Sequence, residues 1–260
     1  MWTRKELKER GKAAFKANYW RAVLVGLIMT VLFGGGYSAV GRMAGNSFDN
    51  SADITSTADI TETPDVTING KDMTPEDIEN ILTEAGVTPQ DLISIALGIF
   101  AVASVLLLFI KVIDILLLNP LEVGCENFFL RNAEEPADLG TIGRAFSPRW
   151  ANNVITLLLR DIFLYLWFCL FLIPGFVKMY SYRMVPFILA DNPDMGGTEA
   201  ITLSRRMMDG QKWNAFVLDL SFIGWYFLAA LTFGLVGIFW TQPYHQATDA
   251  ELYRVLKQNV

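Results

Sequence analysis

The sequence predicts an all-α protein that crosses a membrane several times, and two observations lead to this fold class. Apolar residues make up 52% of the 260 residues, and they are gathered into long runs instead of recurring at the spacing of a water-soluble core. The polar segments between these runs are too short to bury cores of their own. We therefore expect one polytopic helical membrane domain over residues 1–260, with short amphipathic cytoplasmic helices beside its spans.

The charge distribution predicts how the chain is oriented. Residues 1–21 contain seven basic and two acidic residues, whereas residues 42–90 contain ten acidic and two basic ones. Lysine and arginine near the ends of spans mark the cytoplasmic side of a membrane. We therefore expect a basic amphipathic cytoplasmic helix at residues 1–18 and an acidic extracellular loop, flexible in its Ser- and Thr-rich part, at residues 42–88.

Six transmembrane helices, arranged as three hairpins, account for the apolar runs. Starts are marked by a hydroxyl residue before proline, as at Thr88-Pro89 and Ser147-Pro148, and ends by breaks such as Pro174-Gly175 and Asn192-Pro193. The expected spans are residues 19–41, 89–118, 153–173, 176–190, 213–233 and 238–256. They are joined on the cytoplasmic side by a connection at 119–152 and by an amphipathic helix within 191–212.

The last segment, residues 238–256, decides the topology because it is the most polar of the six. If it is a span, both termini lie in the cytoplasm and Arg254 and Lys257 follow the positive-inside bias; five spans would leave them outside. We favour six. An internal echo agrees with three hairpins, since three short segments each precede a helix that mixes aromatic with charged or amide residues. These segments are Leu117–Leu121, Leu172–Phe176 and Gly237–Trp240.

A set of short motifs resembles a known family. The motifs are Asn119-Pro120-Leu121 with Gly124, Ile173-Pro174-Gly175 followed by Tyr180, Tyr182 and Pro186, Ala190-Asp191-Asn192-Pro193, Ser204 with Met208 and Gly210, Gly224-Trp225, and Pro243-Tyr244 with Tyr253. As a set they resemble the bacterial integral-membrane family catalogued as domain of unknown function 975, and the resemblance covers nearly the whole chain except the acidic loop. The resemblance implies a multi-spanning protein of the bacterial plasma membrane, and it carries over no activity, substrate or catalytic residue.

Ionisable residues inside the predicted spans are the candidate ligand-binding residues. A charge in the bilayer core costs about 3 kcal/mol or more, so it normally faces a partner charge or a cavity. The candidates are Arg160, Asp161, Lys178, Arg183, Asp219 and His245. Neighbours on a helix point about 100° apart, so Arg160 and Asp161 should each need another partner. Counting depth along the helices pairs Arg160 with Asp219, and Arg183 with Asp161.

Two interpretations of these charges stay open. They are either structural ion pairs that fix helix register, or a charged groove between the third, fourth and fifth spans. In such a groove, a surplus of cations on Lys178 and Arg183 would bind an anionic ligand such as a lipid headgroup. His245 is the only histidine, and we expect a hydrogen-bonded structural role for it, with a proton relay as the alternative.

The sequence contains no motif that specifies a reaction. It has no His-Glu-x-x-His, no Gly-x-Ser-x-Gly and no Walker loop, and one histidine with two scattered cysteines makes no metal cluster. We therefore expect a non-enzymatic plasma-membrane protein with no cofactor and no metal, which binds membrane lipids, anionic ones in particular, or a membrane-protein partner, and not nucleic acid. The alternative is a small-solute or lipid transporter that uses the broken hairpins of the last four spans.

Overall fold

The structure is a computed structural model, and it describes residues 2–33, 66–68, 71–73, 86, 88–147 and 149–260. Contacts divide the chain into two units. The larger unit comprises Met1–Asn46 and Asp114–Val260, and the smaller one Ser47–Ile113.

The smaller unit contains a β-hairpin and one long helix. Strands β1 (Val66–Ile68) and β2 (Lys71–Met73) pair antiparallel inside the segment predicted as the acidic loop. Helix α5 (Pro89–Ile113) begins after a reciprocal cap, in which the Thr88 backbone and hydroxyl groups donate to the Asp91 carboxylate at 2.8 and 2.6 Å. Its sequence is apolar on every side, which is typical of a membrane span. The rest of the predicted loop lies outside the described residues.

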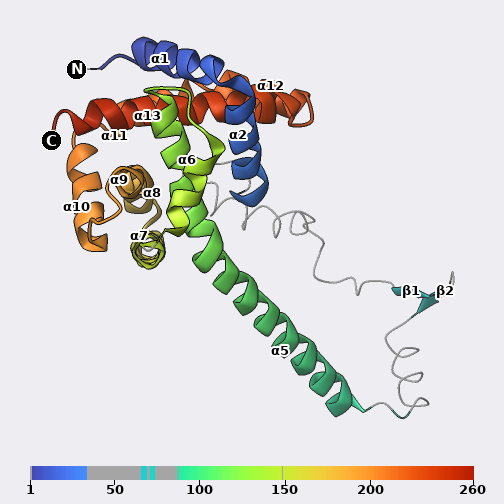
Figure 1. The fold of residues 1–260 in the computed structure, drawn as a ribbon. Helices are drawn as coiled ribbons and strands as arrows, with labels where there is room; N and C mark the ends of the chain where they lie inside the picture. Colours follow the sequence, from blue (N-terminus) through green and yellow to red (C-terminus); the bar gives the residue numbers. More distant parts are fainter. Residues whose placement is uncertain (1, 34–65, 69–70, 74–85, 87, 148) are drawn as a thin grey trace. The chain divides into compact units, whose positions relative to one another are not determined.

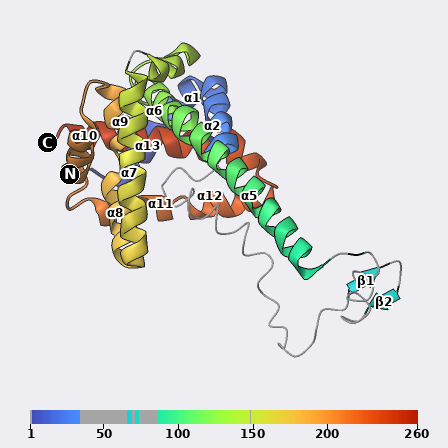
Figure 2. The same cartoon turned by 90° about the horizontal axis from the view of Figure 1, so that it is seen from below.

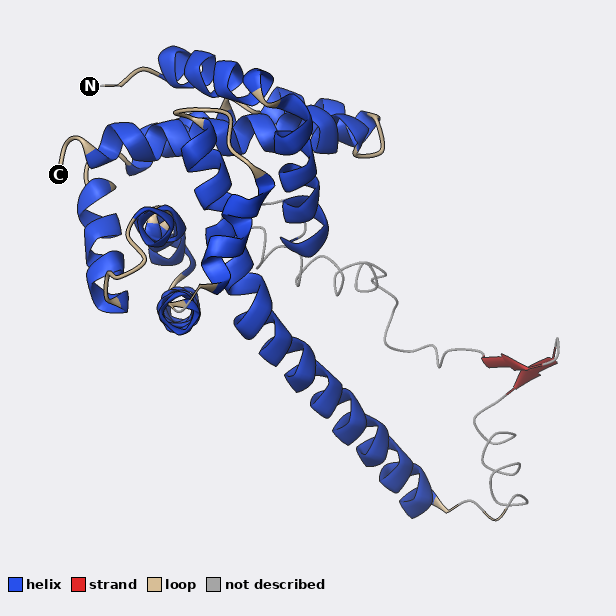
Figure 3. Ribbon diagram, in the orientation of Figure 1, coloured by secondary structure: helices blue, strands red, loops and turns tan. Residues whose placement is uncertain are grey.

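The larger unit is built from helices (Figure 3). In chain order its elements are α1 (Arg4–Ala17), α2 (Tyr19–Phe33), the π-helical turn η1 (Asp114–Leu118), α6 (Asn119–Asn132), the 3-10 helix η2 (Leu139–Phe146), α7 (Trp150–Leu170), α8 (Leu172–Tyr182), α9 (Val185–Asp191), α10 (Gly197–Met207), α11 (Lys212–Leu220), α12 (Ile223–Leu231), the π-helical turn η3 (Gly237–Thr241) and α13 (Gln242–Lys257). Apart from the short hairpin, the regular structure of the described residues is helical, as the sequence predicts.

Helix α13 is the buried centre of the larger unit, although its sequence is polar. It packs against α1, α2 and α6, and α1 runs along it in Figure 1. Leu7, Gly11 and Phe15 recur every four residues and form the buried face of α1. A Cβ atom on Gly11 would lie 2.8 Å from the Cα atom of Thr248 on α13. Glycine is therefore what lets the two helix backbones meet.

The N-terminal helices are also fixed at their corner, where α1 and α2 meet at a bend of 105°. Asn18 at this corner donates to the Oδ1 atom of Asn132 and to the carbonyl of Ala137, both at 2.8 Å. Nearby, the Asp138 carboxylate caps η2 by accepting the Gly140 backbone N–H at 3.0 Å, and this bond lowers the pKa of Asp138. The corner is thus tied to the chain that follows α6.

Three helices among the described residues are long and apolar enough to cross a membrane: Gln90–Asn132, Trp150–Leu170 and Lys212–Leu231. The bent pair of α1 and α2 raises this number to four if it forms one broken span. The number is smaller than the six spans predicted from the sequence. By length and composition these helices indicate association with a membrane.

Two predicted spans take another form. Residues 176–190 are divided between α8, which ends at Tyr182, and the short, mostly buried α9, which starts at Val185. Residues 238–256 form η3 and most of α13, whose polar side chains are buried within the protein. The predicted connection at 119–152 contains α6, which is also mostly buried. Hydropathy does not distinguish burial in protein from burial in lipid, and this explains the differences.

The turn between α7 and α8, which pack side by side (Figure 2), comes earlier than predicted. The chain is extended at Phe171, whereas Pro174 lies in the first turn of α8, where a proline is tolerated. At the other end of α8, the Ser204 hydroxyl donates to the Ser181 carbonyl at 2.8 Å and accepts the Met184 N–H at 3.2 Å. These two bonds hold the backbone on either side of Arg183.

Replacing Gly11 with alanine should destabilise the protein. The added Cβ would overpack the contact with α13, at a cost of about 1–3 kcal/mol, which exceeds the gain of about 1 kcal/mol in helix propensity. Thermal unfolding in detergent would measure this as a lower midpoint.

Gly224→Ala on α12 is the matched control, because a Cβ at Gly224 meets nothing within 4 Å. This variant should be as stable as the wild type or more so. Equal stabilisation by both substitutions would contradict the close packing of α1 on α13.

Candidate functional site

Arg183, just after the last residue of α8, joins three helices through two carboxylates. Its guanidinium donates to both oxygens of Asp219 on α11 at 2.8 Å, and to both oxygens of Asp249 on α13 at 2.7 and 2.8 Å. The Arg183 and Asp249 side chains are only 7% and 6% exposed. Charge-assisted bonds of this kind are strong because the planar guanidinium matches the carboxylate fork.

Asp219 is shared with two further side chains. Its Oδ2 atom accepts the Tyr180 hydroxyl at 2.9 Å, and its Oδ1 atom lies 3.2 Å from His245 Nε2. The other ring nitrogen of His245 lies 3.6 Å from Asp249 Oδ2, one helical turn away. The imidazole therefore lies between the same two carboxylates that bind Arg183, and of the two it is within hydrogen-bond distance of Asp219 alone.

Arg160 on α7 forms a second buried group. It donates to both oxygens of Glu122 on α6 at 3.0 and 3.2 Å, and its Nε atom donates to Asp161 at 2.9 Å. The Arg160 and Glu122 side chains are 8% and 10% exposed. This pair holds α7 against α6, as the Arg183 group holds α8 against α11 and α13.

The predicted candidates therefore separate into three places. Arg183, Asp219 and His245 meet in one group, Arg160 and Asp161 lie in the other, and Lys178 belongs to neither. The predicted pairing of Arg160 with Asp219 is wrong. So is that of Arg183 with Asp161. A long arginine side chain can bend back to its neighbour in sequence, and the angle between neighbouring residues on a helix does not take this into account. Arg183 is shared by two carboxylates, so it is not a surplus cation.

Four residues in and between these groups were not predicted from the sequence as site residues: Glu122, Glu126, Tyr180 and Asp249. Glu122 and Glu126 were assigned to a cytoplasmic connection, so their spacing of four residues after Pro120 was not examined as a buried helix face. Asp249 follows His245 by the same spacing. That repeated spacing was the available signal.

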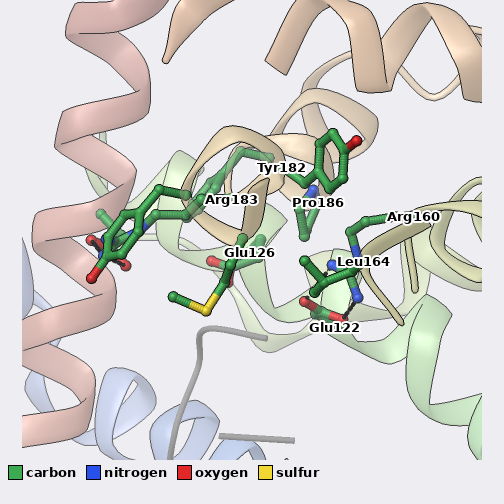
Figure 4. A pocket seen from close by; sticks show the side chains of 11 residues that line it. Glu122, Glu126, Arg160, Leu164, Tyr182, Arg183 and Pro186 are labelled. Atoms are coloured by element: carbon green, nitrogen blue, oxygen red, sulfur yellow. Dashed lines mark hydrogen bonds and ion pairs between the residues drawn. The ribbon is translucent and has the colours of Figure 1, made fainter. Parts of the chain in front are cut away.

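A cavity of about 30 Å³ lies between the two groups, which is room for one or two water molecules. Figure 4 shows Glu126 between Arg183 on one side and the Arg160–Glu122 pair on the other. Glu126 is 3% exposed, and its Oε2 atom has no hydrogen-bond partner among the described residues. Such a carboxyl group is unusual, because buried polar groups are nearly always satisfied.

Asp219, His245 and Asp249 place ligand atoms within 4.8 Å of one another, and within the described part of the chain they are the one group close enough to hold a metal ion. Arg183, however, donates to both of these carboxylates at 2.7–2.8 Å. The guanidinium thus supplies the positive charge that a metal would supply, and the donor set does not favour a metal while Arg183 is in place.

A separate basic pocket lies on the surface between α8, α10 and the start of α11, with a volume of about 390 Å³. It is lined by Val177, Lys178, Ser181, Thr202, Arg205, Arg206, Asp209 and Lys212. Its four basic side chains face one acidic side chain, Asp209, which lies 3.4 Å from Lys212. Exposed apolar side chains of α8, Ile173 and Val177, begin at the pocket and continue along the helix.

The sequence pattern of one family, described as "Protein of unknown function (DUF975)", matches residues 90–260, which is more than half of the chain. The chain belongs to this family. The family predicted from the motifs is thus confirmed, and all of the motifs lie within the matched residues, which do not include the N-terminal helices α1 and α2. No curated protein and no solved structure matches the chain.

Several motif residues of this DUF975 protein hold the buried groups in place. Ser204 fixes the backbone around Arg183, and Tyr180 donates to Asp219. Tyr253 near the end of α13 donates to Asp191 at the end of α9 at 2.9 Å. The motifs that identify the family thus include residues that position the charged side chains.

Arg160 and Glu122 should be energetically coupled. Changing either residue alone to leucine breaks a buried ion pair by removing one of its members, at a cost of about 3–5 kcal/mol. The double variant should recover part of this loss, as measured by unfolding of the four proteins of the cycle.

Arg160→Leu combined with Asp219→Leu is the comparison cycle, since these two residues belong to different groups. Its coupling should be the smaller of the two. A larger coupling in this second cycle would contradict the observed pairing.

Proposed function

We propose that this protein is a non-enzymatic, multi-pass protein of the bacterial plasma membrane that binds an anionic lipid in the basic pocket between α8, α10 and α11. The observation that carries the proposal is the charge of this pocket, in which four basic side chains face one acidic side chain. The exposed apolar residues Ile173 and Val177 at its edge suit acyl chains. A phosphate-bearing headgroup with hydrocarbon tails matches both surfaces.

The buried arginines are less suited to this role than the sequence suggested. Arg160 and Arg183 are each paired with carboxylates inside the protein, so an anion would have to displace those partners. Among the predicted candidates, Lys178 is the one that lies in the basic pocket. The proposed site is therefore a pocket on the surface of the protein, and not the buried groove predicted between the third, fourth and fifth spans.

The same proposal includes an orientation. Basic residues concentrate in residues 1–21 and recur at Arg254 and Lys257, which supports cytoplasmic termini and an extracellular segment at residues 42–88. Trp213, which is 71% exposed beside Lys212 of the basic pocket, is typical of the membrane–water interface. The pocket would then face the anionic inner leaflet.

Neutralising the basic pocket should abolish specific lipid binding. We expect native mass spectrometry of the gently extracted protein to show bound phosphatidylglycerol in preference to phosphatidylcholine. Lys178→Gln combined with Arg205→Gln and Arg206→Gln should weaken this binding about a hundredfold, because each basic residue contributes about 1 kcal/mol.

A variant with the same change of charge on α1, where Lys5, Lys12 and Lys16 are exposed, controls for general attraction to the membrane. It should bind lipid like the wild type. Equal losses in the two triple variants would contradict a specific site, and a wild type without any adduct would favour the protein-partner alternative.

Transport is a second candidate, which the broken helices favour. The chain turns between α12 and η3 through Phe233 and Gly234, with φ angles of 50° and 86°, and a positive φ is costly for phenylalanine. Together with the extended residue Phe171, this gives two interrupted hairpins. Discontinuous helices around a central cavity are typical of secondary transporters.

Transport requires that the cavity open to each side of the membrane in turn. We therefore expect a cysteine at the cavity residue Tyr182, in a Cys169→Ser background, to react with a membrane-impermeant thiol reagent from both faces of sealed vesicles. The buried Cys125 provides the unreactive reference. Labelling from one face alone, or from neither, would contradict transport through this cavity.

A further inference from the structure

Helices α6 and α13 begin in the same way. Each follows a five-residue π-helical turn, η1 or η3, and each starts with an amide residue and a proline, Asn119-Pro120 in α6 and Gln242-Pro243 in α13. Glu122 and His245 lie three residues after the amide residue, and Glu126 and Asp249 lie seven residues after it. The two helices thus place ionisable side chains at matching positions.

Helix α8 follows the same pattern less closely. Its proline, Pro174, is followed at the corresponding distance by Tyr180. In all three helices the residue six positions after the proline lines the 30 Å³ cavity; these residues are Glu126, Tyr180 and Asp249. Three helices of the predicted internal echo therefore converge on one point, and sites formed where structural repeats meet commonly bind the ligand of a membrane protein.

The charges around this point do not balance. Asp219 and Asp249 share the single positive charge of Arg183, and a protonated His245 between them would neutralise that group. Glu126 then adds a third carboxyl group, and its Oε2 atom is buried without a partner among the described residues. An isolated buried carboxylate is so costly that such a group is neutralised in practice.

We infer that the cavity beside Glu126 is a binding site for a small monovalent cation, either a proton carried by the Glu126 carboxyl group or a Na⁺ ion beside it. Both ligands supply the missing positive charge, and both fit a space for one or two water-sized species. Six other ionisable side chains line the cavity together with Glu126: Glu122, Arg160, Tyr180, Tyr182, Arg183 and Asp249. The site is independent of the basic pocket, since the two share no residue.

The test compares thermal unfolding of the wild-type protein and Glu126→Gln in detergent, in choline buffers over a range of pH and then with Na⁺ added. Glutamine has the shape of a protonated glutamate, but it has no titratable proton and no negative charge to attract Na⁺. A proton bound in the folded state and released on unfolding makes the folding equilibrium less favourable as the pH rises, by up to about tenfold per pH unit.

Two results support the inference and distinguish the ligands. If the ligand is a proton, the wild type loses stability with rising pH and Glu126→Gln loses less, with no effect of Na⁺. If the ligand is Na⁺, adding it stabilises the wild type and not the variant. The exposed Glu135→Gln provides the matched control and should behave as the wild type. Identical pH and Na⁺ responses of the wild type and Glu126→Gln would overturn the inference.

Infrared spectroscopy of the wild type gives a second readout, which applies even if Glu126→Gln does not fold. A proton site predicts the carbonyl stretch of a buried carboxylic acid at neutral pH, and a Na⁺ site predicts a shift of carboxylate bands when Na⁺ replaces choline. The absence of both signals would overturn the inference. Lipid binding at the basic pocket would be unaffected by either result.

Discussion

The larger unit depends on the pairing of the buried guanidinium of Arg183. A charge in a medium of low dielectric has to be paired, and removing one partner of such a pair costs about 3–5 kcal/mol. Asp219 and Asp249 come from α11 and α13, so α11, which is separated from α8 by two helices in the chain, and the last helix, α13, must both reach Arg183. This requirement explains how a polar helix, α13, can occupy the centre of a protein rich in apolar helices.

The helical class follows from the sequence, because long apolar runs and caps such as Thr88 with Asp91 depend on local chemistry. The number of spans does not follow from the sequence. Hydropathy measures how readily a segment leaves water, and it does not tell whether the segment enters lipid or the interior of the protein. The polar segment after Gly237 satisfies its side chains within the protein, and the segment after Phe176 divides at the turn that holds Arg183. Both outcomes depend on contacts between residues that are far apart in the sequence.

The charged residues of the site were predictable as a set, but their pairing was not. Counting depth along each helix requires a common origin, and the break at Phe171 removes it for α7 and α8. Glu122 and Glu126 were missed because α6 was taken for a connection, although a spacing of four residues after a proline is what α6 shares with α13. The internal repeat in the sequence indicates the same spacing if the proline-containing segments are interpreted as the starts of helices.

The two proposed sites differ in the sign of their excess charge. Inside the protein, carboxyl groups exceed the guanidinium groups around Arg183, so the interior attracts a cation and repels an anion. At the surface, the pocket that contains Lys178 has the opposite excess. An anionic headgroup and a small cation can therefore bind to the same molecule without competing. Met179, Tyr180 and Tyr182, which line the cavity, lie on the helix that supplies Lys178 to the basic pocket. The two sites therefore use different residues of the same helix.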